Sequence, residues 1–159
     1  MIAEKSKING EISGILVSAE DRDGSKVELK SLWKENPVIL FFYPKDNTPG
    51  CTTEAQNFRD SLGEIRKAGF TVIGISKDNV KSHCKFIDKQ ELNFPLLSDE
   101  SGELSEFFEV WVEKSMYGKK YMGIQRSTFI IEKGIVVKVF EKVKVKEHAK
   151  EILEYIRLR

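Results

Sequence analysis

One of the two cysteines of this 159-residue chain lies in a setting that favours a reactive thiol. Cys51 follows a Thr-Pro-Gly sequence, at what we expect to be the first turn of a helix. With Thr48 as the N-cap and Pro49 at the first helical position, Cys51 falls at the third. Free amide groups and the positive end of the helix dipole favour ionised sulfur there. The thiolate is the nucleophilic form of cysteine, so the position predicts a nucleophile.

An apolar strand and an amphipathic helix are predicted on either side of this turn. Residues 38–43 form an uninterrupted β-favouring run, which is typical of a strand buried on both faces. Turn-forming residues fill 44–50. Apolar residues then recur at helical spacing from 55 to 68, with Glu54 among the charged residues of the opposite face, and Gly69 ends the helix.

Cys51 has a simpler interpretation as a small buried apolar side chain. A core cysteine would more naturally lie inside a periodic apolar run than behind Thr-Pro-Gly. The sequence therefore favours the reactive thiol over the packing residue.

The residues around Cys51 resemble the signature loop of the peroxiredoxins. The pattern is Pro44-x-x-x-Thr48-x-x-Cys51, and FFYPKDNTPGCTTEA at 41–55 is similar to the bacterioferritin comigratory protein, or Q-type, subfamily. The loop pattern alone is weak evidence, but the resemblance extends in the family's order over nearly the whole chain. Further matches are Lys-Ser-His at 81–83, Phe-Pro-Leu-Leu-Ser-Asp at 94–99 and the stretch at 121–129.

The resemblance implies a thiol-dependent peroxidase that reduces hydrogen peroxide and organic hydroperoxides. The Cys51 thiolate would attack one peroxide oxygen, the other would leave as water or alcohol, and sulfur would become a sulfenic acid. Thr48 would hydrogen-bond the peroxide, Pro44 would shield the thiolate from water, and Arg126 would stabilise the charge on sulfur and on oxygen. Without the resemblance, Thr48 would be interpreted as a helix cap and Arg126 as one partner of a surface ion pair.

Cys84 is the candidate for a resolving cysteine. Many relatives carry that residue five positions after the peroxidatic cysteine, where this chain has Gln56. Another branch of the subfamily places it in the region of the helix predicted at 78–90, which contains Cys84. Alternatively, helical spacing from apolar neighbours makes Cys84 a small core residue. A Cys51–Cys84 disulfide needs Cα atoms within about 7 Å, so we expect the turn around Cys51 to unwind on oxidation.

Composition agrees with a small soluble protein, which we expect to be one domain spanning residues 1–159. The 26 Lys and Arg residues nearly balance the 25 Asp and Glu residues, which argues against nucleic acid or an anionic membrane as a partner. The N-terminus lacks the apolar core of a signal peptide, and no run is long enough to span a membrane. We therefore expect a cytoplasmic protein without cofactor or metal. The resemblance implies a monomer or weak homodimer recycled by thioredoxin or a similar dithiol.

The order of the predicted elements indicates an α/β fold. A parallel βαβ unit at the centre lies between an N-terminal hairpin and a C-terminal hairpin with a closing helix. This order fits a thioredoxin-like fold with a central mixed sheet flanked by helices and an N-terminal β-hairpin, which the resemblance also implies. The predicted strands are 15–18, 26–29, 38–43, 70–76, 95–97, 128–131 and 135–140.

Other functions need features that this chain lacks or leaves open. A thioredoxin-type reductase needs a Cys-x-x-Cys pair, which Cys51 does not begin. A metal site built on His83, Cys84 and His148 has no ligand spacing, and we expect His83 at the helix surface or in packing. Two readings stay open: a one-cysteine peroxidase recycled by an external thiol, and a non-enzymatic thioredoxin-fold binding protein in which Cys51 is incidental.

Overall fold

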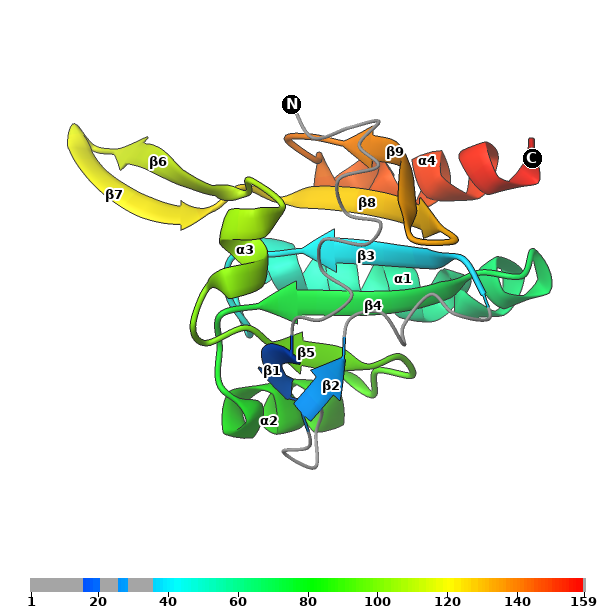
Figure 1. Ribbon diagram of the computed structural model, residues 1–159, viewed down its shortest axis with the longest axis horizontal. Coiled ribbons are helices and arrows are strands. Elements are labelled where there is room, and N and C mark those ends of the chain that lie inside the picture. Colours follow the sequence, from blue (N-terminus) through cyan, green and yellow to red (C-terminus); the bar gives the residue numbers. More distant parts are fainter. Residues whose placement is uncertain (1–15, 21–25, 29–35, 159) are drawn as a thin grey trace.

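The computed structural model describes residues 16–20, 26–28 and 36–158, with side chains from residue 36 onward. A seven-stranded sheet with the order β2-β1-β5-β4-β3-β8-β9 forms the centre (Figure 1). Its strands are β1 (Leu16–Glu20), β2 (Lys26–Glu28), β3 (Val38–Phe42), β4 (Thr71–Ser76), β5 (Leu96–Ser98), β8 (Ser127–Glu132) and β9 (Ile135–Phe140). The helices are α1 (Pro49–Lys67), α2 (Val80–Gln90), α3 (Glu103–Phe107) and α4 (Val145–Arg157).

Strand β3 lies inside the sheet, between β4 and β8, and leads into the Cys51 loop. All five of its residues are buried, as the uninterrupted apolar run predicts. It pairs in parallel with β4 and antiparallel with β8, so the sheet is mixed. The parallel pair requires a crossover, which α1 supplies. The predicted βαβ unit is confirmed.

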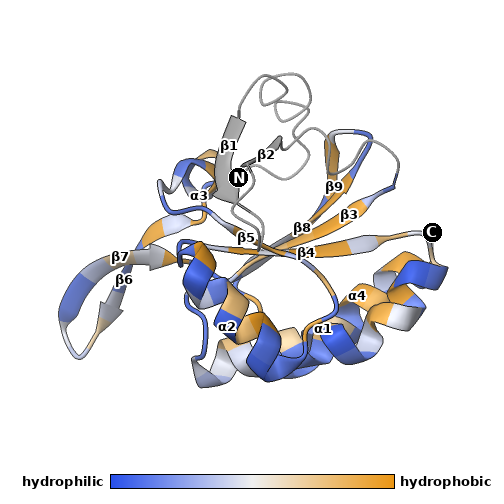
Figure 2. Cartoon of the chain, turned by 90° about the horizontal axis from the view of Figure 1, so that it is seen from below, coloured by the Kyte–Doolittle hydropathy of each residue, from blue (hydrophilic) through white to orange (hydrophobic). Residues whose placement is uncertain are grey.

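Two hydrophobic clusters cover the two faces of the sheet. Alternate β3 residues enter different clusters, because successive side chains of a strand point to opposite faces. One cluster packs the sheet against α1, α2 and α4, which lie together on one face (Figure 2). The other cluster includes Leu104 of α3 and Phe108 directly after it. The helix that carries Cys51 is therefore packed against the sheet through one of these hydrophobic clusters.

The predicted ends of the helices are close to the observed ones. Helix α1 has Thr48 at its N-cap and ends before Gly69, whose φ of 90° is a left-handed conformation that other residues disfavour. Helix α2 starts two residues later than predicted, because the Asn79 side chain accepts a hydrogen bond from the Ser82 N–H and caps it there. In the described part of the chain, no helix combines the length and apolar character needed to cross a membrane.

Strands β1 and β2 form the predicted N-terminal antiparallel pair, and their connection lies outside the described residues. A second, two-stranded sheet, which was not predicted, is formed by β6 (Trp111–Met116) and β7 (Lys119–Ile124). This hairpin projects from the body of the molecule (Figure 1). Most residues of the two strands are exposed, so their Lys-rich sequence lacks the alternation of apolar and polar residues that predicts a half-buried strand.

Candidate active site

The Cys51 thiol lies in the first turn of α1, where the sequence predicted it. Pro49 occupies the first turn and Thr48 is extended, with φ −93° and ψ 152°. The cysteine is only 2% exposed and packs in the hydrophobic cluster beneath the helices. A buried thiol at a helix start meets free amide groups on one side and low-dielectric core on the other.

Arg126 reaches this thiol because of the strand register. It immediately precedes β8, whose first residue, Ser127, pairs with Phe42 at the end of β3. The start of β8 therefore lies beside the strand end that leads to Cys51. The Arg126 Nη2 atom is 3.3 Å from Cys51 Sγ. Gly50 permits this approach, since a Cβ there would lie 3.2 Å from the same nitrogen.

Glu54 completes the charged group, and the prediction of an exposed Glu54 is wrong. Its side chain is 1% exposed, and Oε1 accepts a hydrogen bond of 2.6 Å from Arg126 Nη1. Glu54 follows Cys51 by three residues, so the two side chains share a helix face. The planar guanidinium contacts both at once, as its forked geometry allows. The spacing from Cys51 was the signal that could have revealed Glu54.

Burial and charge oppose each other within this group. Burial raises the pKa of Glu54 from 4.5 to about 7, although the charge and hydrogen bond of Arg126 lower it. Its second oxygen, Oε2, has no hydrogen-bond partner among the described residues, which adds to the cost of ionising it. Burial lowers the pKa of Arg126, but the charges of Glu54 and Cys51 outweigh this effect and raise it. Arg126 is therefore a fixed cation.

We expect Glu54→Gln to change how stability depends on pH. The folded protein keeps a proton on Glu54 up to about pH 7, whereas the unfolded chain loses it near pH 4.5. Stability contributed by this proton is therefore lost as the pH rises between those values, by about 3 kcal/mol in total. Urea unfolding of both proteins at several pH values measures the difference. Parallel stability curves for wild type and variant would contradict the assignment.

Thr48 occupies the N-cap position as predicted, but its side chain makes no capping hydrogen bond to the helix. Its hydroxyl donates a hydrogen bond of 2.8 Å to the carbonyl oxygen of Lys45 instead. The hydroxyl lone pairs are thus left to accept a hydrogen bond. The first-turn N–H groups of Gly50 and Cys51 have no acceptor within the helix and receive none from Thr48. Donors and an acceptor therefore lie together at this turn.

Pro44 is half-buried in the loop between β3 and α1 that leads to Cys51. Lys114 of β6, which the sequence analysis did not single out, lies within electrostatic reach of Cys51. Burial and the charge of Arg126 lower the pKa of Lys114, while the charge of Cys51 raises it. The hairpin therefore adds a second basic side chain near Cys51.

Comparison with known proteins decides the family. The AhpC/TSA family matches residues 15–139, which is most of the chain. The chain belongs to the AhpC/TSA family. Within it the chain is a peroxiredoxin of the Bcp group, that is, a thiol-dependent peroxidase. The putative peroxiredoxin bcp of Coxiella burnetii is 49% identical over 82% of this chain and 87% of its own length. Peroxiredoxin Bcp of Bacillus subtilis is 47% identical over 84% and 85%, respectively.

Solved structures agree with the fold of this peroxiredoxin. The bacterioferritin comigratory protein of Xanthomonas campestris, studied for its alkyl peroxide reduction activity, superposes with a TM-score of 0.82. It is 42% identical in sequence, and the match covers 88% of this chain and 89% of that one. The thioredoxin-like fold expected from the sequence is confirmed.

The second cysteine of this peroxiredoxin lies on the opposite side of α2 from Ser82, which contacts the loop before Cys51. Both cysteines are thiols, and Cys84 is half-buried in α2. Helix α2 contacts the β3–α1 loop through Ser82, which donates to Asp46 Oδ2 at 2.7 Å, and contacts α1 through Gln90, which accepts from Gln56 Nε2 at 2.8 Å. Cys84 is two residues from Ser82, so its side chain is turned about 200° around the helix axis from that of Ser82.

His83, next to Cys84, belongs to a buried ion pair. It is 1% exposed, so the surface position that we considered is wrong and the packing position is right. Its Nδ1 lies 2.7 Å from Asp46 Oδ2 and its Nε2 lies 3.1 Å from the carbonyl oxygen of Leu97. Both partners offer oxygen acceptors to a ring N–H. Tyr43 donates to the other Asp46 oxygen at 2.6 Å.

This ion pair ties the start of α2 to the loop that carries the reactive thiol. Asp78 strengthens the connection, because its Oδ2 accepts from the Asp46 N–H at 2.8 Å and from Ser76 Oγ at 2.7 Å. Asp46, Asp78 and His83 place three potential metal-ligand atoms within 4.8 Å of one another. Their mutual hydrogen bonds account for that proximity.

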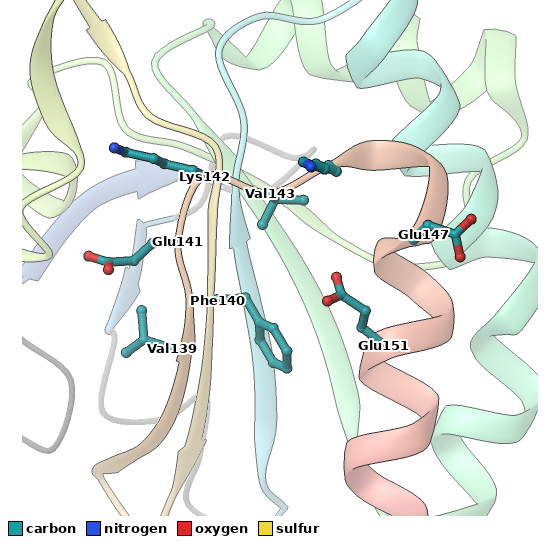
Figure 3. Close-up of a pocket in the computed structure, with 8 residues that line it drawn as sticks. Val139, Phe140, Glu141, Lys142, Val143, Glu147 and Glu151 are labelled. Atoms are coloured by element: carbon teal, nitrogen blue, oxygen red, sulfur yellow. The ribbon is translucent and has the colours of Figure 1, made fainter.

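Two cavities lie beside the start of α4, and one of them also borders the first turn of α1. A groove of about 480 Å³ runs between Pro49 and Gly50 on one side and Val145 and Lys146 on the other. A second, of about 550 Å³, is lined by residues 139–144 and by Glu147 and Glu151 (Figure 3). Only the first includes residues adjacent to Cys51, so it is the candidate for the organic part of a substrate.

Proposed function

We propose that this peroxiredoxin reduces hydrogen peroxide and organic hydroperoxides through a sulfenic acid on Cys51. The observation that carries the proposal is the 3.3 Å contact between Arg126 Nη2 and a buried cysteine sulfur at a helix start. A guanidinium and a helix terminus both stabilise a thiolate. The groove beside Pro49 would accept the organic part of a hydroperoxide. The alkyl peroxide reduction studied in the Xanthomonas relative supports this substrate class.

The reaction is a displacement at oxygen. The Cys51 thiolate forms a bond to the terminal peroxide oxygen as the O–O bond breaks, and the electron pair of that bond leaves with the other oxygen. That oxygen takes a proton and departs as water or alcohol, and the sulfur is left as a sulfenic acid. Sulfur is oxidised by two electrons and the peroxide is reduced by two.

Each neighbour of the thiol has a role in this step. Thr48 has committed its proton to Lys45, so its oxygen accepts the peroxide hydrogen and fixes the line of approach. The N–H groups of Gly50 and Cys51, together with Arg126, stabilise the charge that moves onto oxygen. Pro44 restricts the access of water to the thiolate. Glu54 holds the Arg126 guanidinium in position through the 2.6 Å contact.

Cys84 is the proposed resolving thiol, and thioredoxin or a similar dithiol would regenerate the enzyme. Helices α1 and α2 follow the parallel strands β3 and β4, so both helices begin at the same edge of the sheet. Unwinding of the first turn of α1 would let Cys51 move toward Cys84. A disulfide of this kind is transient in a reducing compartment, so we propose that the catalytic cycle takes place in the cytoplasm. We also propose that the protein is a monomer or weak homodimer.

A second scheme, with direct reduction of the Cys51 sulfenic acid by an external thiol, is favoured by one observation. Cys84 lies on the side of α2 opposite Ser82, whose hydroxyl contacts the Asp46 loop, and directly follows His83. Unwinding α2 there would break the His83–Asp46 pair, and separating a buried ion pair costs about 3–5 kcal/mol. The two schemes share the first chemical step and differ in the fate of the sulfenic acid.

The Cys84→Ser variant separates these schemes. If Cys84 resolves the sulfenic acid, the variant should form no intramolecular disulfide and lose turnover with thioredoxin, while its first oxidation by peroxide stays as fast as in the wild type. Stopped-flow oxidation and non-reducing mass analysis measure both steps. Unchanged turnover with thioredoxin would reject the resolving role and leave direct reduction.

A further inference from the structure

The β6–β7 hairpin exposes apolar side chains that the peroxidase chemistry described above does not use. Among the described residues, it carries four of the seven exposed large hydrophobic side chains, and Tyr117 is 98% exposed. The two strands pair with each other and form a sheet separate from the main one. Ile124 and Trp111 pack the base of the hairpin into the core, whereas the apolar side chains near its tip are exposed, so core packing does not account for their apolar character. The four residues are Met116, Tyr117, Tyr121 and Met122.

One face of the hairpin is both apolar and basic. The register pairs Lys114 with Tyr121 and Met116 with Lys119, so these four side chains point to the same side. Lys114 and Tyr121 also pack together over Gly123, where an added Cβ would meet both side chains. We call these four residues the basic hairpin face. All of its charged residues are lysines, whereas the one acidic residue of the hairpin, Glu113, faces the other way beside Lys120.

The basic hairpin face lies near the Cys51 site. Lys114 feels the charges of both Cys51 and Arg126. At the base of the hairpin, the Gln125 N–H donates to the carbonyl oxygen of Val110 at 2.7 Å, and Arg126 follows directly. A protein that brings a sulfur atom to Cys51 would therefore also meet the hairpin.

We infer that the basic hairpin face is the docking surface for the protein dithiol that reduces the enzyme, and that this partner is acidic and partly apolar around its reactive cysteine. The inference rests on the proposed thiol peroxidase function and deepens it. In either scheme for the sulfenic acid, the reductant must reach a sulfur that is oxidised at this edge of the sheet. Tyr and Met supply apolar contact area, and lysines attract an acidic partner over a distance.

A second copy of the chain fits the basic hairpin face less well. In a two-fold symmetric contact the same patch meets itself, so Lys114 and Lys119 would face their own counterparts. Like charges opposed across an interface cost free energy. An acidic partner is therefore the better match.

Lys119→Glu and the double variant Lys119→Glu/Met116→Ala test the inference. Thioredoxin with its NADPH-dependent reductase serves as the protein reductant, and dithiothreitol serves as the small one. We expect kcat/KM for thioredoxin to fall about tenfold in the single variant, mainly through KM, and further in the double variant. Turnover with dithiothreitol should stay at the wild-type level. Added salt should shrink the difference, because it screens charge attraction.

Lys67→Glu is the matched control, since it makes the same charge change at the last residue of α1, about 24 Å along the helix from Cys51. It should leave both activities unchanged. Equal thioredoxin kinetics in wild type and Lys119→Glu would overturn the inference, as would an equal loss with dithiothreitol. A wild-type dimer in sedimentation that Lys119→Glu dissociates would assign the face to self-association instead. No peroxide consumption by the wild type with dithiothreitol would reject the proposed function itself.

Discussion

Cys51→Ser is expected to reduce peroxide consumption to the uncatalysed rate, whichever thiol serves as the reductant. A serine hydroxyl is not ionised at neutral pH by a helix start and one arginine, and it cannot form a sulfenic acid. The effect should be the largest of any single substitution in the chain. Peroxide disappearance with dithiothreitol, followed in wild type, Cys51→Ser and Cys84→Ser, measures it.

The same set of variants supplies the control. Cys84→Ser removes the other thiol but should keep its first oxidation by peroxide. Serine is close to cysteine in size, so both variants should retain the fold, which circular dichroism and thermal unfolding can check. Residual catalysis by Cys51→Ser together with loss of activity in Cys84→Ser would mean that Cys84, not Cys51, reacts with the peroxide.

Arg126→Gln is expected to slow the reaction of Cys51 with peroxide about 10²–10³-fold, because it removes a fixed charge aimed at the reacting sulfur. The substitution also leaves the 1% exposed Glu54 without its partner, so we expect a loss of stability of about 3 kcal/mol. Stopped-flow oxidation gives the rate, and urea unfolding gives the stability.

A double variant distinguishes catalysis from folding. Arg126→Gln/Glu54→Gln replaces the buried ion pair with two neutral amides, so it should recover most of the lost stability. The rate of oxidation should stay low, because the cation beside sulfur is still missing. Recovery of the rate together with the stability would show that Arg126 acts only through the fold.

The fold was predictable because its main strands and helices have strong patterns. The apolar run at 38–43 and the periodic helix behind Thr-Pro-Gly led to the βαβ unit and placed Cys51 in the first turn. Arg126 needed the family resemblance, since a lone arginine before a strand carries no local signal. Only the pairing of Ser127 with Phe42 brings it beside the thiol, and such pairing between distant strands is not written in local sequence.

The errors at the site also have physical causes. Glu54 was assigned to the solvent face because a carboxylate is rarely buried, but a cation from β8 compensates for its burial. Thr48 looked like a cap, yet the Lys45 carbonyl competes successfully for its hydroxyl. His83 was ambiguous because its partner, Asp46, lies in a different loop. Each of these outcomes depends on a tertiary contact.

The most direct test of the central claim is peptide mass analysis of the reduced Cys84→Ser protein after one equivalent of hydrogen peroxide. The sulfenic acid should be trapped with dimedone as it forms. The account predicts one dimedone adduct per chain, on the peptide that contains Cys51. An unmodified Cys51 peptide with the peroxide left unconsumed would contradict it.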